Sequence, residues 1–184
     1  MKNGIQLQPT LPEQMRLVRK LYRQAFPANE RRPLLLACKN REDMAAELLS
    51  LTRGNEFLGF TLLQTWRDIV HIDYLAINPD CRGQGMGGEM LKKIAQRYPN
   101  MRIVLETEQR DDKAENSKQR AMRKAFYLRN GFCETNLIQH VAGYDMDVMC
   151  SSRHRVEREE LNRLLNLAYG PLMARLLGSR VLEK

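Results

Sequence analysis

The sequence of 184 residues lacks several features that mark membrane, secreted or metal-binding proteins. No apolar run reaches the ~18 residues that a membrane span needs, and the opening MKNGIQLQPT contains no apolar signal core. The four cysteines are widely separated and show no zinc-binding spacing: they are Cys38, Cys81, Cys133 and Cys150. We therefore expect a cytoplasmic protein with reduced thiols and no membrane partner.

Negative charge is scarce: 30 Lys and Arg face 22 Asp and Glu, which gives a formal net charge of +8. This excess permits polyanionic partners and suits a small phosphorylated cofactor. The basic residues are scattered, without a helix-turn-helix, a zinc module or an alternation of aromatic and basic residues, so we expect no nucleic-acid partner. Five acids and two bases lie within residues 106–115, a segment that we call the acidic island.

Hydrophobic periodicity predicts strands and helices that alternate along the chain. With 43% hydrophobic residues, a chain of this length can bury a sizeable core in one domain, or two at most. We expect strands near 5–7, 44–52, 56–65, 69–77, 101–108, 135–142 and 144–150. We expect helices near 12–26, 34–40, 89–98 and 117–130, and a helical segment after residue 153. This order predicts one α/β sheet with a helical appendage.

The segment from Leu75 to Gly88, LAINPDCRGQGMGG, is the most informative part of the sequence. A strand ends, a loop with four glycines in six residues follows, and an amphipathic helix begins. Glycines permit positive φ, successive amides can converge on an anion, and a helix N-terminus adds its unpaired N–H groups. The pattern fits a pyrophosphate, although it is neither a P-loop nor a Rossmann fingerprint. A plain glycine-rich turn is the alternative.

The loop also carries a resemblance to a known family. Arg82-Gly83-Gln84-Gly85-Met86-Gly87 resembles the Arg/Gln-x-x-Gly-x-Gly/Ala signature of the GNAT N-acetyltransferase superfamily, and LAINP resembles its usual lead-in. The later FYLRNGF, residues 126–132, resembles its Tyr-x-x-x-Gly-Phe block. The resemblance covers roughly residues 1–150 and rests on two motifs that a strand separates.

This resemblance implies a fold and an activity. The fold would be a single mixed, mostly antiparallel sheet, splayed between its fourth and fifth strands and flanked by helices. Residues 1–150 would form the acetyltransferase domain, and residues 151–184 a C-terminal helical extension. The activity would be transfer of the acetyl group of acetyl-CoA, as cosubstrate, to a primary amine by direct attack and without a metal.

The resemblance also implies which residues bind acetyl-CoA. The backbone of Leu75, Ala76 and Ile77 would hold the acetyl and pantetheine parts. The loop would hold the pyrophosphate, through Arg82, Gly83, Gln84, Gly85, Met86, Gly87 and Gly88. Arg120 shares a helical face with Tyr127, so it would contact the CoA phosphates, unless that face is simply solvated. Many relatives carry an Asn one turn into this helix, where the present sequence has Lys118 and Gln119, so one pantetheine contact would differ.

The catalytic groups are assigned partly from the residues and partly from the resemblance. Tyr127 matches the family tyrosine that protonates the departing thiolate; a core tyrosine is the alternative. Glu106 and Glu108 alternate along one strand, and close carboxylates raise each other's proton affinity, which suits a general base. Leu105-Glu106 resembles the base-containing block of the alanine-acetylating branch. His71 or Asp73 on the preceding strand, a water chain, or a merely solvated strand end remain alternatives.

Two hints about the acceptor conflict. The acidic island suits a cation such as a polyamine, an aminoglycoside-like amine or a lysine side chain. The segment PANERRP lies where relatives shape the acceptor pocket, and its arginines favour a carboxylate or phosphate instead. We place Glu108, Glu30, Arg31 and Asp73 among the acceptor-binding residues. A small cationic amine is favoured over a protein lysine or N-terminus, and a non-catalytic acyl-CoA-binding regulatory module is a further alternative.

The C-terminal segment shows a leucine stripe. Leu161, Leu164, Leu165 and Ala168 recur at helical spacing, and Gly170-Pro171 interrupts the pattern. A free amphipathic helix of this length is marginal in water. We expect the stripe to pack on its own domain, with a homodimer interface as the alternative, so the protein would be a monomer or a homodimer.

Overall fold

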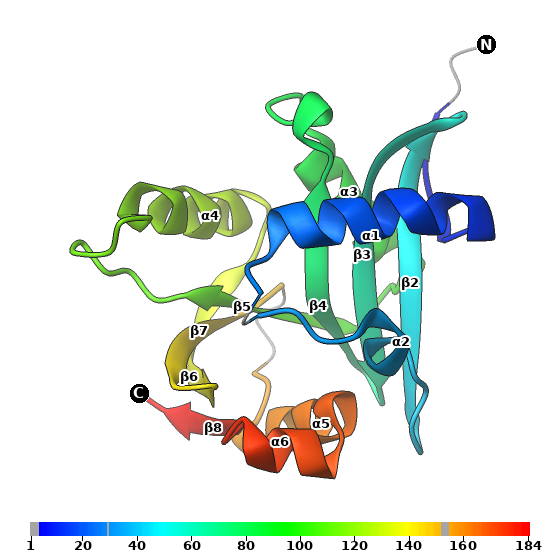
Figure 1. Cartoon of the computed structure of the whole chain (residues 1–184). Helices are drawn as coiled ribbons and strands as arrows, with labels where there is room; N and C mark the ends of the chain where they lie inside the picture. Colours follow the sequence, from blue (N-terminus) through cyan, green and yellow to red (C-terminus); the bar gives the residue numbers. More distant parts are fainter. Residues whose placement is uncertain (1–3, 29, 152–154) are drawn as a thin grey trace. The chain divides into compact units, whose positions relative to one another are not determined.

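The computed structural model describes residues 4–28, 30–151 and 155–184 (Figure 1). The strands are β1 (Ile5–Pro9), β2 (Met44–Arg53), β3 (Glu56–Trp66), β4 (Ile69–Ile77), β5 (Arg102–Glu108), β6 (Cys133–Val141), β7 (Tyr144–Cys150) and β8 (Arg180–Glu183). The helices are α1 (Met15–Ala25), α2 (Leu34–Ala37), α3 (Met86–Arg97), α4 (Ser117–Arg129), α5 (Arg158–Tyr169) and α6 (Pro171–Leu176). Short 3-10 turns lie at Pro12–Gln14 and Pro79–Cys81.

The strands form one sheet in the order β1-β2-β3-β4-β5-β7-β6-β8. It is antiparallel except between β4 and β5, which are joined through α3 as parallel neighbours must be. Their parallel register covers three residue pairs: Ile69 with Arg102, Val70 with Ile103, and His71 with Val104. This short pairing accords with the expected splay between the fourth and fifth strands, and the predicted fold class is confirmed.

By its internal contacts the chain divides into two compact units. The first unit comprises Met1–Asn40, Ala45–Thr65 and Ile72–Met101. The second unit comprises Arg41–Met44, Trp66–His71 and Arg102–Lys184. Within the residues that the structure describes, no helix is both long and apolar enough to cross a membrane, and no group of three or more His, Cys, Asp or Glu side chains is arranged to hold a metal ion.

The core of the first unit lies between α1 and the sheet. Val18, Leu21 and Tyr22 recur at the spacing of one helical face, and all three are buried. They pack in one cluster with Phe60 of β3 and Tyr74 of β4. The helix begins after a turn that opens with a proline and ends before the next proline, as the sequence predicts.

The core of the second unit contains the leucine stripe. Leu161, Leu164 and Leu165 of α5 are buried in one cluster with Val104 of β5 and Val148 of β7. The end of the chain forms β8, which pairs antiparallel with β6 and which the sequence analysis did not predict. The helical segment after residue 153 is thus α5, α6 and a strand. The domain boundary at residue 150 stays a prediction.

An ion-pair network fixes α5 in the second unit. The Arg102 guanidinium contacts Glu160 of α5 at 2.7 Å and Asp68 before β4 at 2.7 Å. Hydrogen bonding to Arg102 lowers the pKa of both carboxyls below their usual values. The Glu160 carboxylate also accepts the Glu157 N–H at 3.1 Å, which caps the first turn of α5.

Candidate active site

The glycine-rich loop of residues 82–88 belongs to the first unit and runs directly into α3. Gly83 and Gly85 have φ of +73° and +78°, the left-handed region that residues with a Cβ rarely adopt. A Cβ at either position would meet nothing within 4 Å, so backbone conformation, and not lack of space, requires glycine. The Glu89 N–H donates to the Gly85 carbonyl at 3.0 Å and closes the first helical turn. The N–H groups before Glu89 have no acceptor within the helix and can bind an anion.

The apolar face of α3 fixes the position of this N-terminus. Met86, Met90 and Ile94 repeat at four-residue spacing and are buried in the first unit, where α3 packs against β1. The loop itself is exposed from Arg82 to Gly85. A fixed helix N-terminus behind an exposed loop is the arrangement that a pyrophosphate group requires.

The end of β4 is set by a close backbone contact that the sequence analysis missed. A Cβ added at Gly59 of β3 would lie 2.4 Å from the Ala76 carbonyl oxygen and 3.1 Å from the Ile77 Cα. Only glycine therefore permits β3 and this part of β4 to lie so close together. A lone glycine inside the apolar run EFLGF was the available signal. Leu75, Ala76 and Ile77, the expected acetyl-CoA backbone contacts, depend on this packing.

In the second unit, Glu106 and His71 form one pair. The His71 Nε2 lies 2.8 Å from the Glu106 Oε2, and the two side chains are only 1% and 9% exposed. The other carboxylate oxygen, Oε1, is buried and has no hydrogen-bond partner among the described residues. The sequence analysis treated these residues as rival bases, whereas the structure joins them. Such a pair can hold and release a proton, and the unpartnered Oε1 can accept one more hydrogen bond.

Tyr127 lies on α4 of the same unit. Its ring makes edge contacts with Phe126 and Phe132, at centroid distances of 5.1 and 5.7 Å. Burial raises the pKa of the Tyr127 phenol above its usual value; the Glu106 carboxylate also raises it, and the Arg123 guanidinium lowers it. The phenol therefore stays protonated at neutral pH, which a proton donor requires.

Comparison with known proteins decides the family. A sequence model described as the acetyltransferase (GNAT) family matches residues 15–132, more than half of the chain. The chain belongs to the GNAT acetyltransferase family. It is therefore an acyltransferase of a family that uses acetyl-CoA. The comparison with curated proteins gave no match.

Solved structures support the GNAT fold. A putative GNAT acetyltransferase from Bacteroides thetaiotaomicron is similar with a TM-score of 0.68 and 18% identity, over 94% of this chain and 98% of that chain. The ribosomal-protein-S18-alanine N-acetyltransferase from Escherichia coli gives 0.58 and 18%, over 84% and 97%. An aminoglycoside 6'-N-acetyltransferase complexed with coenzyme A gives 0.62 and 13%, over 83% and 99%. At these identities the likeness concerns the fold.

The acidic island of this GNAT chain is largely paired within the second unit. Glu108 contacts Arg123 at 2.5 Å and Arg120 at 3.5 Å. Arg120 further donates to the Asn116 Oδ1 at 2.7 Å and to the Gln109 carbonyl at 3.1 Å. Glu106 and Glu108 therefore have different basic partners, His71 for Glu106 and Arg120 with Arg123 for Glu108. Arg120 holds its own loop, so a contact with CoA phosphates rests on the resemblance alone.

Asp73 and the neighbouring loop are also locked in place, in the first unit. Asp73 pairs with Arg32, and the two side chains are 6% and 11% exposed. The Tyr74 hydroxyl donates to the Glu30 carbonyl at 2.9 Å, and the Tyr22 hydroxyl donates to the Arg32 carbonyl at 3.0 Å. Burial raises the pKa of both phenols, so both stay protonated donors. This geometry makes Asp73 an anchor for the loop of residues 30–33, and its contact with the acceptor stays a prediction.

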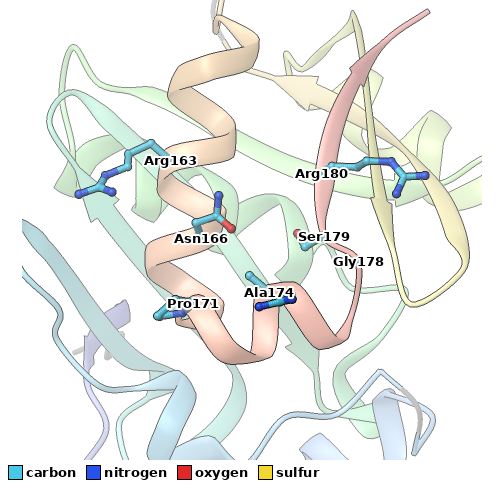
Figure 2. A pocket seen from close by; sticks show the side chains of 8 residues that line it. Arg163, Asn166, Pro171, Ala174, Gly178, Ser179 and Arg180 are labelled. Atoms are coloured by element: carbon cyan, nitrogen blue, oxygen red, sulfur yellow. The ribbon is translucent and has the colours of Figure 1, made fainter.

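A concavity of about 520 Å³ lies in the C-terminal part of the second unit, around α5, α6 and β8 (Figure 2). Figure 2 shows Arg163 and Arg180 pointing to opposite sides, with Asn166 between them. Arg163 forms an ion pair with Glu42 at 2.8 Å. The side chains do not converge on a common point, and none of the predicted site residues lines this concavity.

Proposed function

We propose that this GNAT protein transfers the acetyl group of acetyl-CoA to a primary amine by direct attack. The observation that carries the proposal is the exposed loop at the start of α3, with positive φ at Gly83 and Gly85. In this assignment the amides of residues 82–88 bind the pyrophosphate. The backbone of Leu75, Ala76 and Ile77 binds the acetyl and pantetheine parts, and Arg120 supplies a phosphate contact.

Glu106 acts as the general base and His71 positions it. The substrate ammonium loses one proton to the Glu106 carboxylate, and the neutral amine nitrogen then forms a bond with the thioester carbonyl carbon. As the carbon–sulfur bond breaks, that nitrogen gives its second excess proton to solvent, and Glu106 releases its own proton to solvent before the next turnover. The buried and unpartnered Oε1 of Glu106 supports this role, because a substrate N–H or an ordered water would satisfy it. His71, held at 2.8 Å from the other oxygen, keeps the carboxylate in one orientation.

Tyr127 acts as the general acid. When the carbon–sulfur bond breaks, the phenol gives its proton to the CoA sulfur and later regains one from solvent. Its raised pKa supports the role, since a neutral phenol is needed at the moment of thiolate departure. A phenylalanine here would preserve the ring contacts with Phe126 and Phe132 while removing that proton.

The acceptor is proposed to be a small-molecule amine. The similar solved structures do not identify the acceptor. One is named as an acetyltransferase of a ribosomal protein and another as an acetyltransferase of an aminoglycoside. The sequence favoured a small cationic amine because of the acidic island. The structure weakens that reason, since Glu106, Glu108 and Asp112 each have a basic partner. A protein lysine or N-terminus is the second candidate. A cytoplasmic location and a monomeric or homodimeric state stay predictions.

A turnover screen tests the proposal. Acetyl-CoA is supplied with a panel of small amines, peptide N-termini and lysine peptides, and free CoA thiol is measured. We expect thiol release that depends on at least one amine and that falls strongly in Tyr127→Phe. Acetyl-CoA that raises the melting temperature without any turnover across the panel would instead favour a non-catalytic acyl-CoA-binding module.

A further inference from the structure

A pocket of about 670 Å³ lies wholly in the first unit, between α1, the loop that follows it, α2 and β2. Its volume is in the range of small-molecule sites. Its apolar wall includes Met15, Leu34, Leu35 and Leu48. The aromatic ring of Tyr22 completes that wall, with its hydroxyl held by Arg32.

The charged residues of this pocket all have one sign. Four arginines and no acid are found among its described lining residues: Arg19, Arg23, Arg31 and Arg32. Arg32 is matched by Asp73. Arg19 and Arg23 lie four residues apart on α1, where like charges repel, and no ion pair with an acid is seen for either within the described residues.

Arg31 adds an observation that a solvated basic face would not explain. Its Nε is buried and has no hydrogen-bond partner among the described residues. A buried guanidinium N–H without an acceptor is unfavourable, and a guanidinium fork fits a carboxylate or a phosphate. The pocket therefore has an apolar wall and two exposed arginines, and a third lining residue, Arg31, has one buried N–H that lacks an acceptor.

We propose that this pocket selects acceptors that carry an anionic oxygen group, a carboxylate or a phosphate, on an apolar body beside the amine. The inference rests on the proposed function in so far as the pocket's occupant is the acceptor. The charges of the chain favour it: three of the five acids of the acidic island contact basic side chains of their own unit, whereas Arg19 and Arg23 of the pocket show no ion pair within the described residues. The sequence gave two conflicting expectations, a cationic acceptor from the acidic island and an anionic one from the arginines. The proposal adopts the anionic acceptor.

The kinetic test uses pairs of amines that share an arylalkyl body and differ only in a carboxylate or its carboxamide. We expect the wild-type kcat/KM ratio, carboxylate over carboxamide, to be at least about tenfold. The ratio should collapse toward one in Arg31→Gln and in the double variant Arg19→Gln, Arg23→Gln. Arg16→Gln is the matched control, because Arg16 is exposed on the same helix and does not line the pocket. The same amine with a phosphate monoester in place of the carboxylate shows which of the two anions the pocket prefers.

A binding test keeps the inference separate from the proposed function. The arylalkyl carboxylate without its amine is titrated by calorimetry, with the carboxamide as reference. Binding that Arg31→Gln weakens, that Arg16→Gln spares and that added salt reduces would support the pocket even if no amine were acetylated. Arg31→Lys, which keeps the charge, should retain part of the affinity. If amines are acetylated without preference for the anion, or if the carboxylate and carboxamide bind alike, the inference is wrong while the acetyltransferase activity stands.

Discussion

Replacement of Gly59 by alanine should disturb the proposed acetyl-CoA site, although Gly59 is not one of its expected contact residues. The new Cβ would lie 2.4 Å from the Ala76 carbonyl oxygen, whereas ordinary contact begins at 3.4 Å. The end of β4 must therefore move by roughly 1 Å, because the atom that it meets is backbone and cannot rotate away. Overpacking of this kind typically costs about 1–3 kcal/mol of unfolding free energy.

Two assays, a melting temperature and a steady-state rate, test the consequences of this displacement. For a chain of this size, a loss of 1 kcal/mol lowers Tm by about 2–4 °C, so we expect Gly59→Ala to melt several degrees lower. A shift of about 1 Å in the groups that position a substrate can cost about a hundredfold in rate, so kcat/KM for acetyl-CoA should fall as well. Gly4→Ala is the matched control, since a Cβ there meets nothing within 4 Å. If Gly59→Ala melts and turns over like Gly4→Ala, the close-contact argument is refuted.

Three further outcomes are expected. Tyr127→Phe should lower kcat by about a hundredfold with little change in acetyl-CoA affinity; an unchanged kcat, with chemistry rate-limiting, would remove the phenol from the mechanism. Glu106→Gln should abolish or shift the rising limb of the kcat/KM pH profile, and an unaltered limb would transfer the base role elsewhere. Burial opposes the ionisation of Asp147, but its ion pairs with Lys124 and Lys184, at 2.7 and 2.8 Å, outweigh this effect and lower its pKa. Its contribution to stability is therefore present above the unfolded pKa of about 4 and is lost as pH falls through the lower folded value. Urea titrations should find Asp147→Asn less stable than wild type at pH 7, with a difference that shrinks as pH falls below the unfolded pKa; a pH-independent difference would contradict the pairing.

The parts of the fold that local pattern determines could be predicted. The helical spacing of Val18, Leu21 and Tyr22 and the junction of strand, glycine loop and helix at residues 75–88 are visible within short windows. The strand Arg180–Glu183 could not be predicted in this way. It is four residues long, it has one buried side chain, Val181, and it exists because it pairs with a strand about 40 residues earlier.

The candidate site was predicted as a set of residues but not as a set of partners. The contact of His71 with Glu106 depends on the register of β4 against β5, and a shift by one residue would turn one side chain to the other face. The pairing of Asp73 with Arg32 joins residues 41 positions apart. The sequence shows that a residue is charged, but it does not show whether that residue pairs with another side chain, as these do, or contacts a substrate.

The central claim is that acetyl-CoA binds at the loop of residues 82–88, and calorimetric titration of acetyl-CoA tests it most directly. Gly85→Glu places a carboxylate beside the expected pyrophosphate, and Gly143→Glu is the matched control: its φ is +82°, against +78° at Gly85, and a Cβ at either position meets nothing within 4 Å. We expect wild type and Gly143→Glu to bind alike and Gly85→Glu to bind at least about tenfold more weakly, a loss of about 1.4 kcal/mol or more. Wild-type affinity in Gly85→Glu would contradict the assignment of the loop as the acetyl-CoA site.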